Sequence, residues 1–426
     1  MKAIVDCNSF YCSCERLFLP HLDKRPVVVL SNNDGCIVSR SDEAKDLNIP
    51  MATPYFLARP IIDKYNVATF SSNYNLYGDL SWRVMETLRS ILGPANVEVY
   101  SVDEAFLNLD EFDGQDLQQV AFKIRKTVEE WTGIKVSVGV APTKVLSKVA
   151  NHLAKKNKDA TECVVILDTK EKISQALQHT PVNEIWGVGR QYGKKLKDLF
   201  AIFTAFDLSK KTEEWAHKNL GGVVGIRLIK ELKGEPAREI EGQLTEKKMI
   251  ATTRMFGHNV KNVSDIKEAV ATYTTKAAEK LRRQRSAANV ISVFVVAKGE
   301  NHNIDFRHGD TKSSHITLPV ATSSTHELIK PAVQLVDQLF VQGKSYKKAG
   351  VMLSGLVPDS TIQGNLFSEK QNCKRQLMGM LDNINFAMRD DMLKFAASGT
   401  TRDWKMRQEL RSPRYTSRWD EMFEVK

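Results

Sequence analysis

The sequence predicts an α+β protein of several domains, and three observations lead to this prediction. Over the first 168 residues, short apolar strands alternate with helical patterns, and some of the strands adjoin as hairpins. A helical region broken by glycines follows, over residues 169–242. A basic segment at 243–356 then combines β-branched strands with helices. A chain of 426 residues is long enough for about two to four domains, each with its own core.

In the first segment, apolar runs of strand length are bounded by polar or turn residues. These runs cover Ala3–Asp6, Pro26–Leu30, Cys36–Ser39, Val97–Ser101, Ala105–Leu109 and Lys135–Val140. Between residues 116 and 132 the period becomes that of an amphipathic helix. Its apolar stripe consists of Leu117, Val120, Ile124, Val128 and Trp131.

The later segments have helices and strands that are easier to delimit. A glycine-containing turn at 187–189 precedes a basic helix, Arg190–Phe200, and a second glycine pair precedes a helix at Val223–Leu232. Further on, we expect a helix at Ile266–Arg285, a long loop, and a helix before the last strand. The expected strands of this segment include Val290–Ala297 and Lys347–Leu353. In the tail, the pattern favours a helix at Gln371–Leu381 after a linker at 359–365.

Composition indicates a cytoplasmic protein without membrane association. Hydrophobic residues make up 42% and charged residues 26%, which is ordinary for a soluble protein. The longest apolar run, near 290–297, is far shorter than a membrane span, and an acid at position 6 interrupts any signal-peptide pattern. The six cysteines form no CxxC pair. A zinc site at Cys7, Cys12 and Cys14 lacks paired ligands, so reduced thiols are the favoured interpretation.

The net charge of +10 is unevenly distributed along the chain. Residues 243–356 contain 17 Lys and Arg against 9 Asp and Glu, whereas the other segments are close to balance. Such a concentration predicts a face that binds a polyanion. For any single basic run the alternative is a solvated helix end.

Two adjacent acids, Asp103 and Glu104, interrupt an alternating pattern between residues 97 and 109. A buried strand has little reason to hold such a pair, because neighbouring residues point to opposite faces. A tight turn would bring both carboxylates to the end of the sheet, and Asp6 ends another apolar run. Three carboxylates there suit two Mg²⁺ ions about 3.5–4 Å apart, the arrangement that clamps a phosphoryl transfer. The alternative is an ordinary solvated turn.

The residues around these acids resemble one family along the whole chain. The stretches Asp6–Tyr11 and Ser101–Phe106 are similar to the two metal-binding motifs of Y-family (translesion) DNA polymerases. The likeness continues at Ser31–Cys36, Ser71–Tyr74, Trp186–Arg190 and Leu410–Thr416. The chain is therefore identified as a member of the Y family, and within it the likeness is to the UmuC-type group, the catalytic subunits of bacterial DNA polymerase V.

The resemblance implies a right-hand-like polymerase with a ferredoxin-like palm, small fingers and a helical thumb that contains a helix-hairpin-helix. It also implies an α/β little finger, in which two helices lie behind a four-stranded sheet, and a partly flexible C-terminal tail. The corresponding ranges are 1–16 and 74–168 for the palm, 17–73 for the fingers, 169–242 for the thumb, 243–356 for the little finger and 357–426 for the tail.

The resemblance also implies the roles of the catalytic residues. Asp6 and Asp103 would bridge two Mg²⁺ ions, Glu104 would bind the ion nearer the reaction, and the backbone C=O of Cys7 would complete the ion associated with the dNTP substrate. Tyr11 occupies the place of the steric gate, which excludes the 2′-OH of a ribonucleotide by crowding. A plain core aromatic is the alternative for Tyr11.

The nucleotide-binding set implied by the resemblance lies in the fingers and palm. It consists of Phe10, Tyr11, Ser39, Lys45 and Lys155. Many Y-family members have Tyr and Arg where this chain has Asp42 and Lys45. Lys45 can meet a phosphate as a point charge, without the bidentate fork of Arg. For Lys155 the alternative is a surface lysine.

Two regions are expected to contact DNA. In the thumb, Gly187 and Gly189 permit a turn whose N–H groups face a phosphate, with Arg190 and Lys194 in the helix that follows. A plain connection between helices is the alternative. In the little finger, the candidates end a helix and are Arg282, Arg283 and Arg285.

A short motif in the tail resembles the Q-x-x-L-F peptide with which bacterial polymerases dock on the β sliding clamp. Its residues are Gln363, Leu366 and Phe367, of which the apolar pair would enter a pocket. The resemblance further implies a cleaved UmuD-type dimer and a RecA filament as partners, beside primed damaged DNA.

We therefore expect an error-prone DNA polymerase of the SOS response, associated with the bacterial nucleoid, that extends primers past lesions. No segment resembles a proofreading exonuclease, and the fingers insertion is small, so low fidelity follows as a hypothesis. Two alternatives are a polymerase-derived DNA-binding scaffold and another two-metal palm enzyme such as a nucleotidyl cyclase. The three acids argue against a scaffold, and the glycine hairpin, the basic segment and the clamp-like peptide argue against a cyclase.

Overall fold

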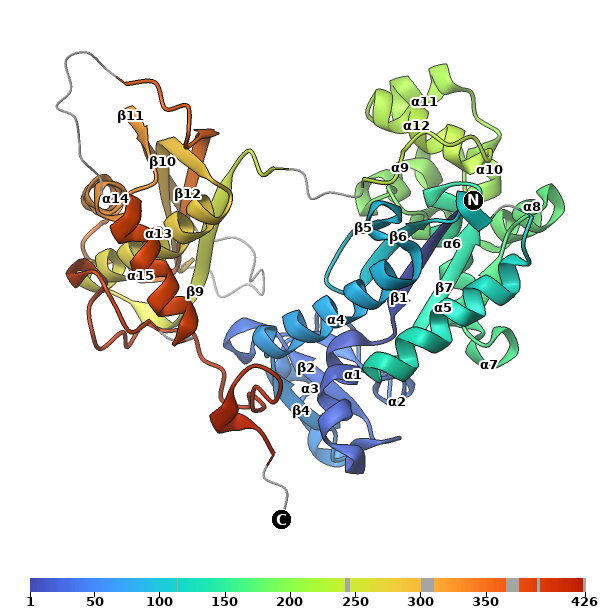
Figure 1. Cartoon of the computed structure of the whole chain (residues 1–426), viewed down its shortest axis with the longest axis horizontal. Coiled ribbons are helices and arrows are strands. Elements are labelled where there is room, and N and C mark those ends of the chain that lie inside the picture. The colour runs from blue at the N-terminus through green and yellow to red at the C-terminus, as the bar shows by residue number, and fades with distance from the viewer. Residues whose placement is uncertain (113, 242–245, 300–309, 365–374, 389–390, 424–426) are drawn as a thin grey trace. The chain divides into compact units, whose positions relative to one another are not determined.

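The computed structural model describes residues 1–112, 114–241, 246–299, 310–364, 375–388 and 391–423 (Figure 1). The chain forms two compact units. The first comprises Met1–Ser31, Gly35–Leu244 and Leu410–Lys426, and the second comprises Asn32–Asp34 and Thr245–Glu409. Except for Asn32–Asp34, the first unit therefore contains the ranges predicted as palm, fingers and thumb, together with the segment from Leu410 onward.

A five-stranded sheet organises the first unit, with the order β5-β6-β1-β7-β8. Its strands are β1 (Lys2–Cys7), β5 (Val97–Val99), β6 (Glu104–Asn108), β7 (Val136–Ala141) and β8 (Val164–Ile166). The central strand β1 pairs antiparallel with β6 and with β7. The strands predicted at positions 3–6, 97–101, 105–109 and 135–140 are confirmed to within two residues at each end.

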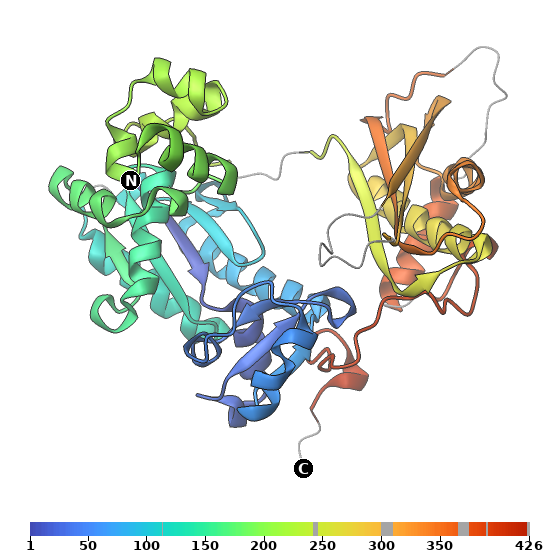
Figure 2. The same cartoon turned by 180° about the vertical axis from the view of Figure 1, so that it is seen from behind.

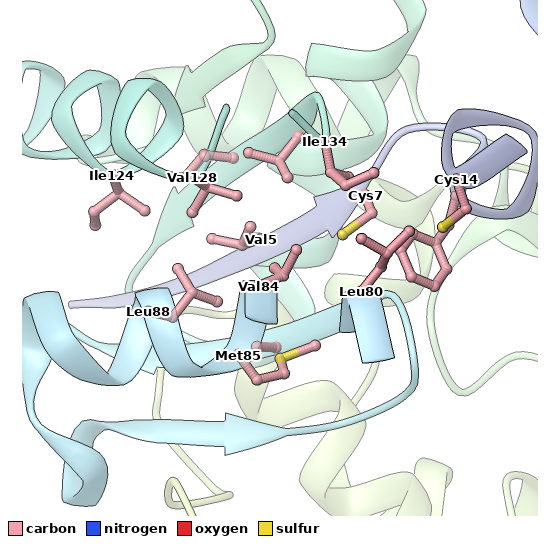
Figure 3. Close-up of a cluster of buried hydrophobic side chains, with 14 of the residues drawn as sticks. Val5, Cys7, Cys14, Leu80, Val84, Met85, Leu88, Ile124, Val128 and Ile134 are labelled. Carbon is pink, nitrogen blue, oxygen red and sulfur yellow. The ribbon is translucent and has the colours of Figure 1, made fainter. Parts of the chain in front are cut away.

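The two faces of this sheet are covered by different helices. Val5 and Cys7 of β1 point into a core between the sheet and two helices, α4 (Tyr74–Leu92) and α5 (Leu117–Thr132), as Figure 3 shows. Because side chains alternate along a strand, Asp6 projects from the opposite face. That face is covered by α6 (Lys144–Lys156), whose lysine Nζ atoms pair with Asp6 and Glu104.

Helix α5 follows its sequence signals closely. Its N-cap Asp116 accepts hydrogen bonds from the backbone N–H groups of Gln118 and Gln119, and Gly133 ends the helix in a left-handed conformation. Ile124 and Val128 of the predicted stripe are buried, but Trp131 is 66% exposed. The inclusion of Trp131 in the apolar stripe was therefore wrong, because its position in the last turn points away from the sheet.

A second, smaller sheet has the order β3-β2-β4 and belongs to the predicted fingers. Its strands are β2 (Val27–Leu30), β3 (Ile37–Arg40) and β4 (Ala68–Ser71). Strand β4 pairs parallel with β2 and was not among the predicted strands. The helices of the palm and fingers not yet named are α1 (Phe10–Phe18), α2 (Asp42–Asp46), α3 (Tyr55–Lys64) and α7 (Lys158–Thr161), and α8 (Lys170–His179) begins the range predicted as thumb.

The predicted thumb is helical and packs on α6 through a shared core. Its helices are α9 (Arg190–Phe200), α10 (Ala205–Ser209), α11 (Glu213–Asn219) and α12 (Val223–Leu232). The predicted bounds of α9 and α12 agree with the structure.

The second unit is a four-stranded antiparallel sheet with the order β11-β10-β12-β9 (Figure 2). The strands are β9 (Ile250–Val260), β10 (Ser286–Ala297), β11 (Thr311–Thr322) and β12 (Tyr346–Pro358). Two helices, α13 (Val263–Arg283) and α14 (Thr325–Leu339), share one core with this sheet, as the resemblance implied. A further helix, α15 (Arg375–Ala387), lies where a tail helix was expected.

The interpretation of residues around 311–322 as part of a long loop was wrong, because they form β11. This strand lies at the edge of its sheet and is largely exposed or half-buried. Its sequence, rich in Thr, Ser and His, therefore lacks the apolar alternation by which a half-buried strand is recognised.

The last described residues belong to the first unit. Leu410 exchanges hydrogen bonds with Ser71 at the end of β4, and Tyr415 is part of the core beneath the palm sheet. The segment from 410 to 423 is thus integrated into the fold. No helix within the described residues is long and apolar enough to cross a membrane.

The close approach of α6 to the sheet depends on Gly139 in β7. A Cβ added there would lie 2.2 Å from the backbone N of Asn151 and 2.4 Å from the backbone O of Ser147. We expect Gly139→Ala to lower the free energy of unfolding by about 1–3 kcal/mol or more, because backbone must move to admit the methyl group. Urea denaturation followed by circular dichroism measures the change.

Gly78→Ala is the matched control for this prediction. Gly78 lies inside helix α4 and a Cβ there meets nothing within 4 Å. Alanine should stabilise the helix by about 0.5–1 kcal/mol. Equal stability of Gly139→Ala and the parent would contradict the proposed packing constraint.

Candidate active site

The three predicted carboxylates meet at one end of the palm sheet. Asp6 on β1 lies directly opposite Glu104 on β6 in the antiparallel register. Strands β5 and β6 form the predicted hairpin, and its turn is closed by hydrogen bonds from the N–H groups of Tyr100 and Ser101 to the carbonyl of Glu104, each 3.0 Å. The backbone N–H of Cys7 donates to the carbonyl of Asp103 at 2.8 Å. The hairpin thus places Asp103 beside the end of β1.

Two lysines of helix α6 neutralise this cluster. Lys155 forms an ion pair with Asp6, whose side chain is 8% exposed, and Lys148 forms one with Glu104 at 2.5 Å. The Lys148 ammonium also lies 4.8 Å from the ring centroid of Tyr100. Both lysines project from the helix that Gly139 lets approach the sheet.

The carboxylates influence each other's protonation. Burial raises the pKa of Asp6 to about 7, with Lys155 opposing that rise and Glu104 adding to it. Burial also acts to raise the pKa of Glu104, but hydrogen bonds with Asp6 and Lys148 outweigh it, so the pKa of Glu104 is lowered. The site therefore concentrates negative charge that only nearby cations make tolerable.

The donor set fits hard divalent cations. Carboxylate and carbonyl oxygens are the ligands that Mg²⁺ prefers. The Cys7 thiol is buried in the core with a raised pKa, so Cys7 can offer only its backbone carbonyl. Within the described residues no three His, Cys, Asp or Glu side chains already have the spacing of a metal site. The carboxylates are held by lysines and by Ser101, whose hydroxyl donates to Asp103.

Tyr11 lies in the first turn of α1, directly after β1. Its ring stacks on Tyr77 of α4, with centroids 4.4 Å apart and an interplanar angle of 15°, and meets the edge of Tyr74 at 6.1 Å. Burial raises the pKa of Tyr11 to about 12, so its hydroxyl stays neutral. The neighbouring Phe10 is 3% exposed, so its ring belongs to the core.

Comparisons with known proteins agree with this architecture. Residues 5–152 match the model of the impB/mucB/samB family, and residues 247–366 match the C-terminal domain of that family. Residues 375–425 match a domain of unknown function, DUF4113. The protein UmuC of Salmonella typhimurium is 41% identical over 431 residues, which cover 100% of both chains. SamB of Salmonella typhimurium is 39% identical, over 98% of each chain.

The chain belongs to the impB/mucB/samB family.

More distant relatives support the same assignment. A DNA polymerase IV of Corynebacterium diphtheriae is 27% identical over 86% of this chain and 77% of its own length. Among solved structures, a Y-family DNA polymerase chimera of Dbh and Dpo4 has a TM-score of 0.69 at 21% identity, covering 84% of this chain and 99% of its own. The predicted fold class is thereby confirmed.

This membership makes the chain a UmuC-type Y-family DNA polymerase that serves translesion synthesis in SOS mutagenesis. The predicted enzyme class and function are confirmed, which removes the scaffold and cyclase alternatives. Such an enzyme binds DNA, and its nucleotide addition depends on divalent metal ions.

In the fingers of the polymerase, Asp42 forms ion pairs with two lysines. Lys45 lies 2.7 Å from one Asp42 oxygen, and Lys158 of α7 pairs with the other. Burial acts to raise the pKa of Asp42, but these two partners lower it to about 2. Lys45 also donates to the hydroxyl of Ser9 at 3.2 Å. Ser39, which was predicted to contact the nucleotide, is 7% exposed, and its hydroxyl contacts the thiol of Cys12. The Ser39 side chain therefore lies in the interior of the protein.

The predicted DNA contacts divide into two groups. Gly187 has a φ of 98°, which favours glycine, and Gly189 caps α9, where Arg190 and Lys194 are exposed. Arg282, in contrast, forms a bidentate pair with Asp382 of α15 at 2.6 and 2.7 Å and donates to the backbone of Ser323.

Because Asp382 and Ser323 occupy the Arg282 guanidinium, the prediction of Arg282 as a DNA contact does not fit the structure. Arg283 is 61% exposed and pairs with Glu279, while Arg285 has a φ of 53° just after α13. Of the clamp motif, Gln363 is exposed, and Leu366 and Phe367 lie outside the described residues.

Two features near the site were missed at the sequence level, the ion pair of Lys148 and the buried carboxyl of Glu15. Lys148 carries a usable signal, because Lys144, Lys148 and Lys155 recur at helical spacing on one face of α6. Glu15 of α1 is fully buried and accepts hydrogen bonds from the hydroxyls of Tyr77, at 2.6 Å, and of Ser412, at 3.0 Å. Nothing in the local sequence indicates a contact between residues 15 and 412.

The protonation of Glu15 should make stability depend on pH. Burial raises its pKa to about 7 from an ordinary value of 4.5, although both hydroxyls oppose the rise. The folded state therefore holds the proton more tightly than the unfolded state. The contribution is complete below pH 4.5 and is lost as the pH rises through 7.

We expect Glu15→Gln to remove this dependence, since an amide oxygen still accepts both hydrogen bonds. Between pH 5 and pH 8 the parent should lose roughly 2 kcal/mol relative to the variant. Urea denaturation at several pH values measures the difference, with Glu130→Gln on the exposed face of α5 as control. Parallel stability curves for parent and Glu15→Gln would refute the prediction.

Proposed function

We propose that Asp6, Asp103 and Glu104 hold two Mg²⁺ ions for the template-directed addition of dNTPs to a primer 3′-OH. The observation that carries this proposal is the convergence of three carboxylates at the end of β1 and the β5–β6 hairpin. The backbone carbonyl of Cys7 joins them as a fourth oxygen ligand. When bound, the two ions lower the pKa of the primer hydroxyl and neutralise the triphosphate.

Of the two lysines of α6, Lys155 changes its partner when the nucleotide binds and Lys148 keeps its own. In the absence of other cations, Lys155 and Lys148 balance the charges of Asp6 and Glu104. Lys155 is 36% exposed, so its side chain is free to leave Asp6 and meet a phosphate of the incoming nucleotide. Lys148 is 16% exposed and remains to orient Glu104.

Nucleotide selection is assigned to the start of α1 and to the fingers. The Tyr11 ring, supported from behind by Tyr77, crowds a ribose 2′-OH and so acts as the steric gate. Phe10 contributes its backbone at this position, and Lys45 contributes a point charge to the triphosphate. Ser39 supports the nucleotide site from the interior through Cys12.

DNA is held by the thumb and the little finger. The turn at Gly187–Gly189 presents N–H groups to a phosphate, and Arg190 and Lys194 add positive charge beside it. In the little finger, Arg283, Arg285 and the segment-wide excess of basic residues hold the duplex backbone. Such contacts are independent of sequence, as a lesion-tolerant polymerase needs.

The enzyme works without proofreading, since no segment resembles an exonuclease, and its small fingers imply low fidelity. We further propose docking on the β sliding clamp through Gln363, Leu366 and Phe367, and activation by a cleaved UmuD-type dimer and a RecA filament. The support for these partners is the sequence resemblance and the 41% identity to UmuC. The location that fits these partners is the bacterial nucleoid.

Asp103→Asn should reduce primer extension by at least about 100-fold, because one charged metal ligand is lost. The measurement is single-nucleotide extension of a primed template with Mg²⁺ and dNTPs, on intact and abasic templates, with clamp, RecA filament and UmuD-type dimer added. DNA binding, measured by fluorescence anisotropy, should be unchanged.

The control for this variant is Asp116→Asn. It makes the same chemical change at the N-cap of α5, where asparagine caps a helix as well as aspartate does. Full activity of Asp103→Asn would exclude Asp103 from the metal site.

A second prediction concerns the clamp. The double substitution Leu366→Ala, Phe367→Ala should weaken binding to the purified sliding clamp by about 100-fold or more, because the apolar anchors are removed. Extension in the absence of the clamp should be unchanged. Ile362→Ala, at a nearby exposed position, is the control, and equal clamp binding by all three proteins would remove this site.

A further inference from the structure

A C-terminal segment, Leu410–Thr416, is built into the unit that contains the nucleotide site. Its first residue continues the edge of the small sheet: the N–H of Ser71 donates to the carbonyl of Leu410 at 3.0 Å, and the N–H of Leu410 donates to the hydroxyl of Ser71 at 2.9 Å. Arg411 forms a parallel bridge with Ser71. The segment thus reaches residues more than 300 positions earlier in the chain.

Asn73 connects this segment with helix α4. Its side-chain Nδ2 lies 2.9 Å from the carbonyl and 3.0 Å from the hydroxyl of Ser412, and 3.2 Å from the carbonyl of Pro413. Its Oδ1 accepts from the N–H of Leu76 and so caps α4, the helix that carries Tyr77. Asn73 is 1% exposed, so these polar groups have no access to water.

Ser412 is also hydrogen-bonded to Glu15, which in turn is hydrogen-bonded to Tyr77, the residue that stacks on Tyr11. Its hydroxyl donates to Oε1 of Glu15 at 3.0 Å, and the hydroxyl of Tyr77 donates to the same oxygen at 2.6 Å. Oε2 of Glu15 has no hydrogen-bond partner within the described residues. Ser412 thus donates one of the two hydrogen bonds described for the Glu15 carboxyl, and a buried carboxyl depends on its few donors.

Because the ring of Tyr77 stacks on the ring of Tyr11, the hydrogen bond that fixes Tyr77 also limits the position of Tyr11. Tyr77 lies 4.4 Å from Tyr11 and nearly parallel to it. Glu15 and Tyr11 stand four residues apart on α1, so they share one face of that helix. A second stack anchors the far end of the segment, where Tyr415 lies 4.6 Å from Phe18, the last residue of α1.

We propose that Ser412 is a positioning residue for sugar selection, which fixes through Glu15 and Tyr77 the ring of Tyr11 that meets the nucleotide. The inference rests on the proposed function of Tyr11 as steric gate. Crowding of a 2′-OH is a contact effect, so displacement of the ring by about half an ångström is enough to relax it. The matched domain of unknown function, residues 375–425, thereby contributes to substrate choice.

The test compares kcat/KM for a dNTP with that for the corresponding rNTP in the full chain with its partners. Ser412→Ala should lower the preference for deoxyribonucleotides by about tenfold, while kcat/KM for the dNTP stays within about threefold of the parent. Ser412→Thr, which keeps the hydroxyl, should retain most of the preference. Arg411→Ala changes an exposed neighbour in the same segment and should leave the preference unchanged.

A double-mutant cycle separates positioning from general loosening of the fold. In a Tyr11→Ala background, Ser412→Ala should have no further effect on the preference, since it acts through that ring. If Tyr11→Ala itself leaves the preference unchanged, the steric-gate assignment fails. If Tyr11→Ala relaxes the preference and folded Ser412→Ala keeps it, the gate stands and the present inference is overturned. Circular dichroism confirms that each variant is folded.

Discussion

The rest of the first unit depends on the pairing of buried carboxylates with lysines at the end of β1. Asp6 and Glu104 face each other across two adjacent strands, and neither charge is tolerable there without a cation. Helix α6 supplies Lys155 and Lys148, and it can do so only because Gly139 lets its backbone lie against the sheet. The apolar packing of α4 and α5 on the opposite face fixes the sheet itself. In the proposed metal site, a divalent cation would take the place of the Lys155 charge beside Asp6, while Lys148 stays paired with Glu104.

Much of the fold follows from local patterns in the sequence. Apolar runs of strand length predict β1 and β7, the Asp103–Glu104 interruption predicts the β5–β6 hairpin, and glycine turns predict the starts of α9 and α12. The failures also have physical causes. Strand β11 is an edge strand without apolar alternation, and Trp131 is apolar in type but exposed in position. The apolar period of a helix shows which of its residues are apolar. Whether an apolar residue in the last turn is buried, as at Trp131, depends instead on how far the neighbouring element extends.

The three carboxylates of the proposed metal site are predicted from the sequence, but neither the ion pair of Lys148 with Glu104 nor that of Lys155 with Asp6 is. Family motifs point to Asp6, Asp103 and Glu104, because these proposed ligands stand in short stretches of sequence that resemble the family. The cations opposite them stand more than 40 residues away, and pairing over such distances is set by tertiary packing. Arg282 illustrates the same limit, since its basic neighbourhood suggested DNA while its guanidinium is bound to Asp382 across 100 residues. Charge type can be read from sequence, but charge compensation requires the fold.

The contacts of Ser412 with Asn73 and Glu15 join the end of the described chain to the residues behind Tyr11. Asn73 and Glu15 are buried polar residues whose partners include Ser412, near the end of the chain. Until that segment docks, the Asn73 side-chain amide lacks its acceptors and the Glu15 carboxyl lacks one of its donors, and water cannot replace them once the core has closed. The support behind Tyr11 is therefore complete only when the last segment of the chain is in place. If Tyr11 is the steric gate as proposed, these hydrogen bonds and the ring stacking couple the Leu410–Thr416 segment to the shape of the nucleotide site.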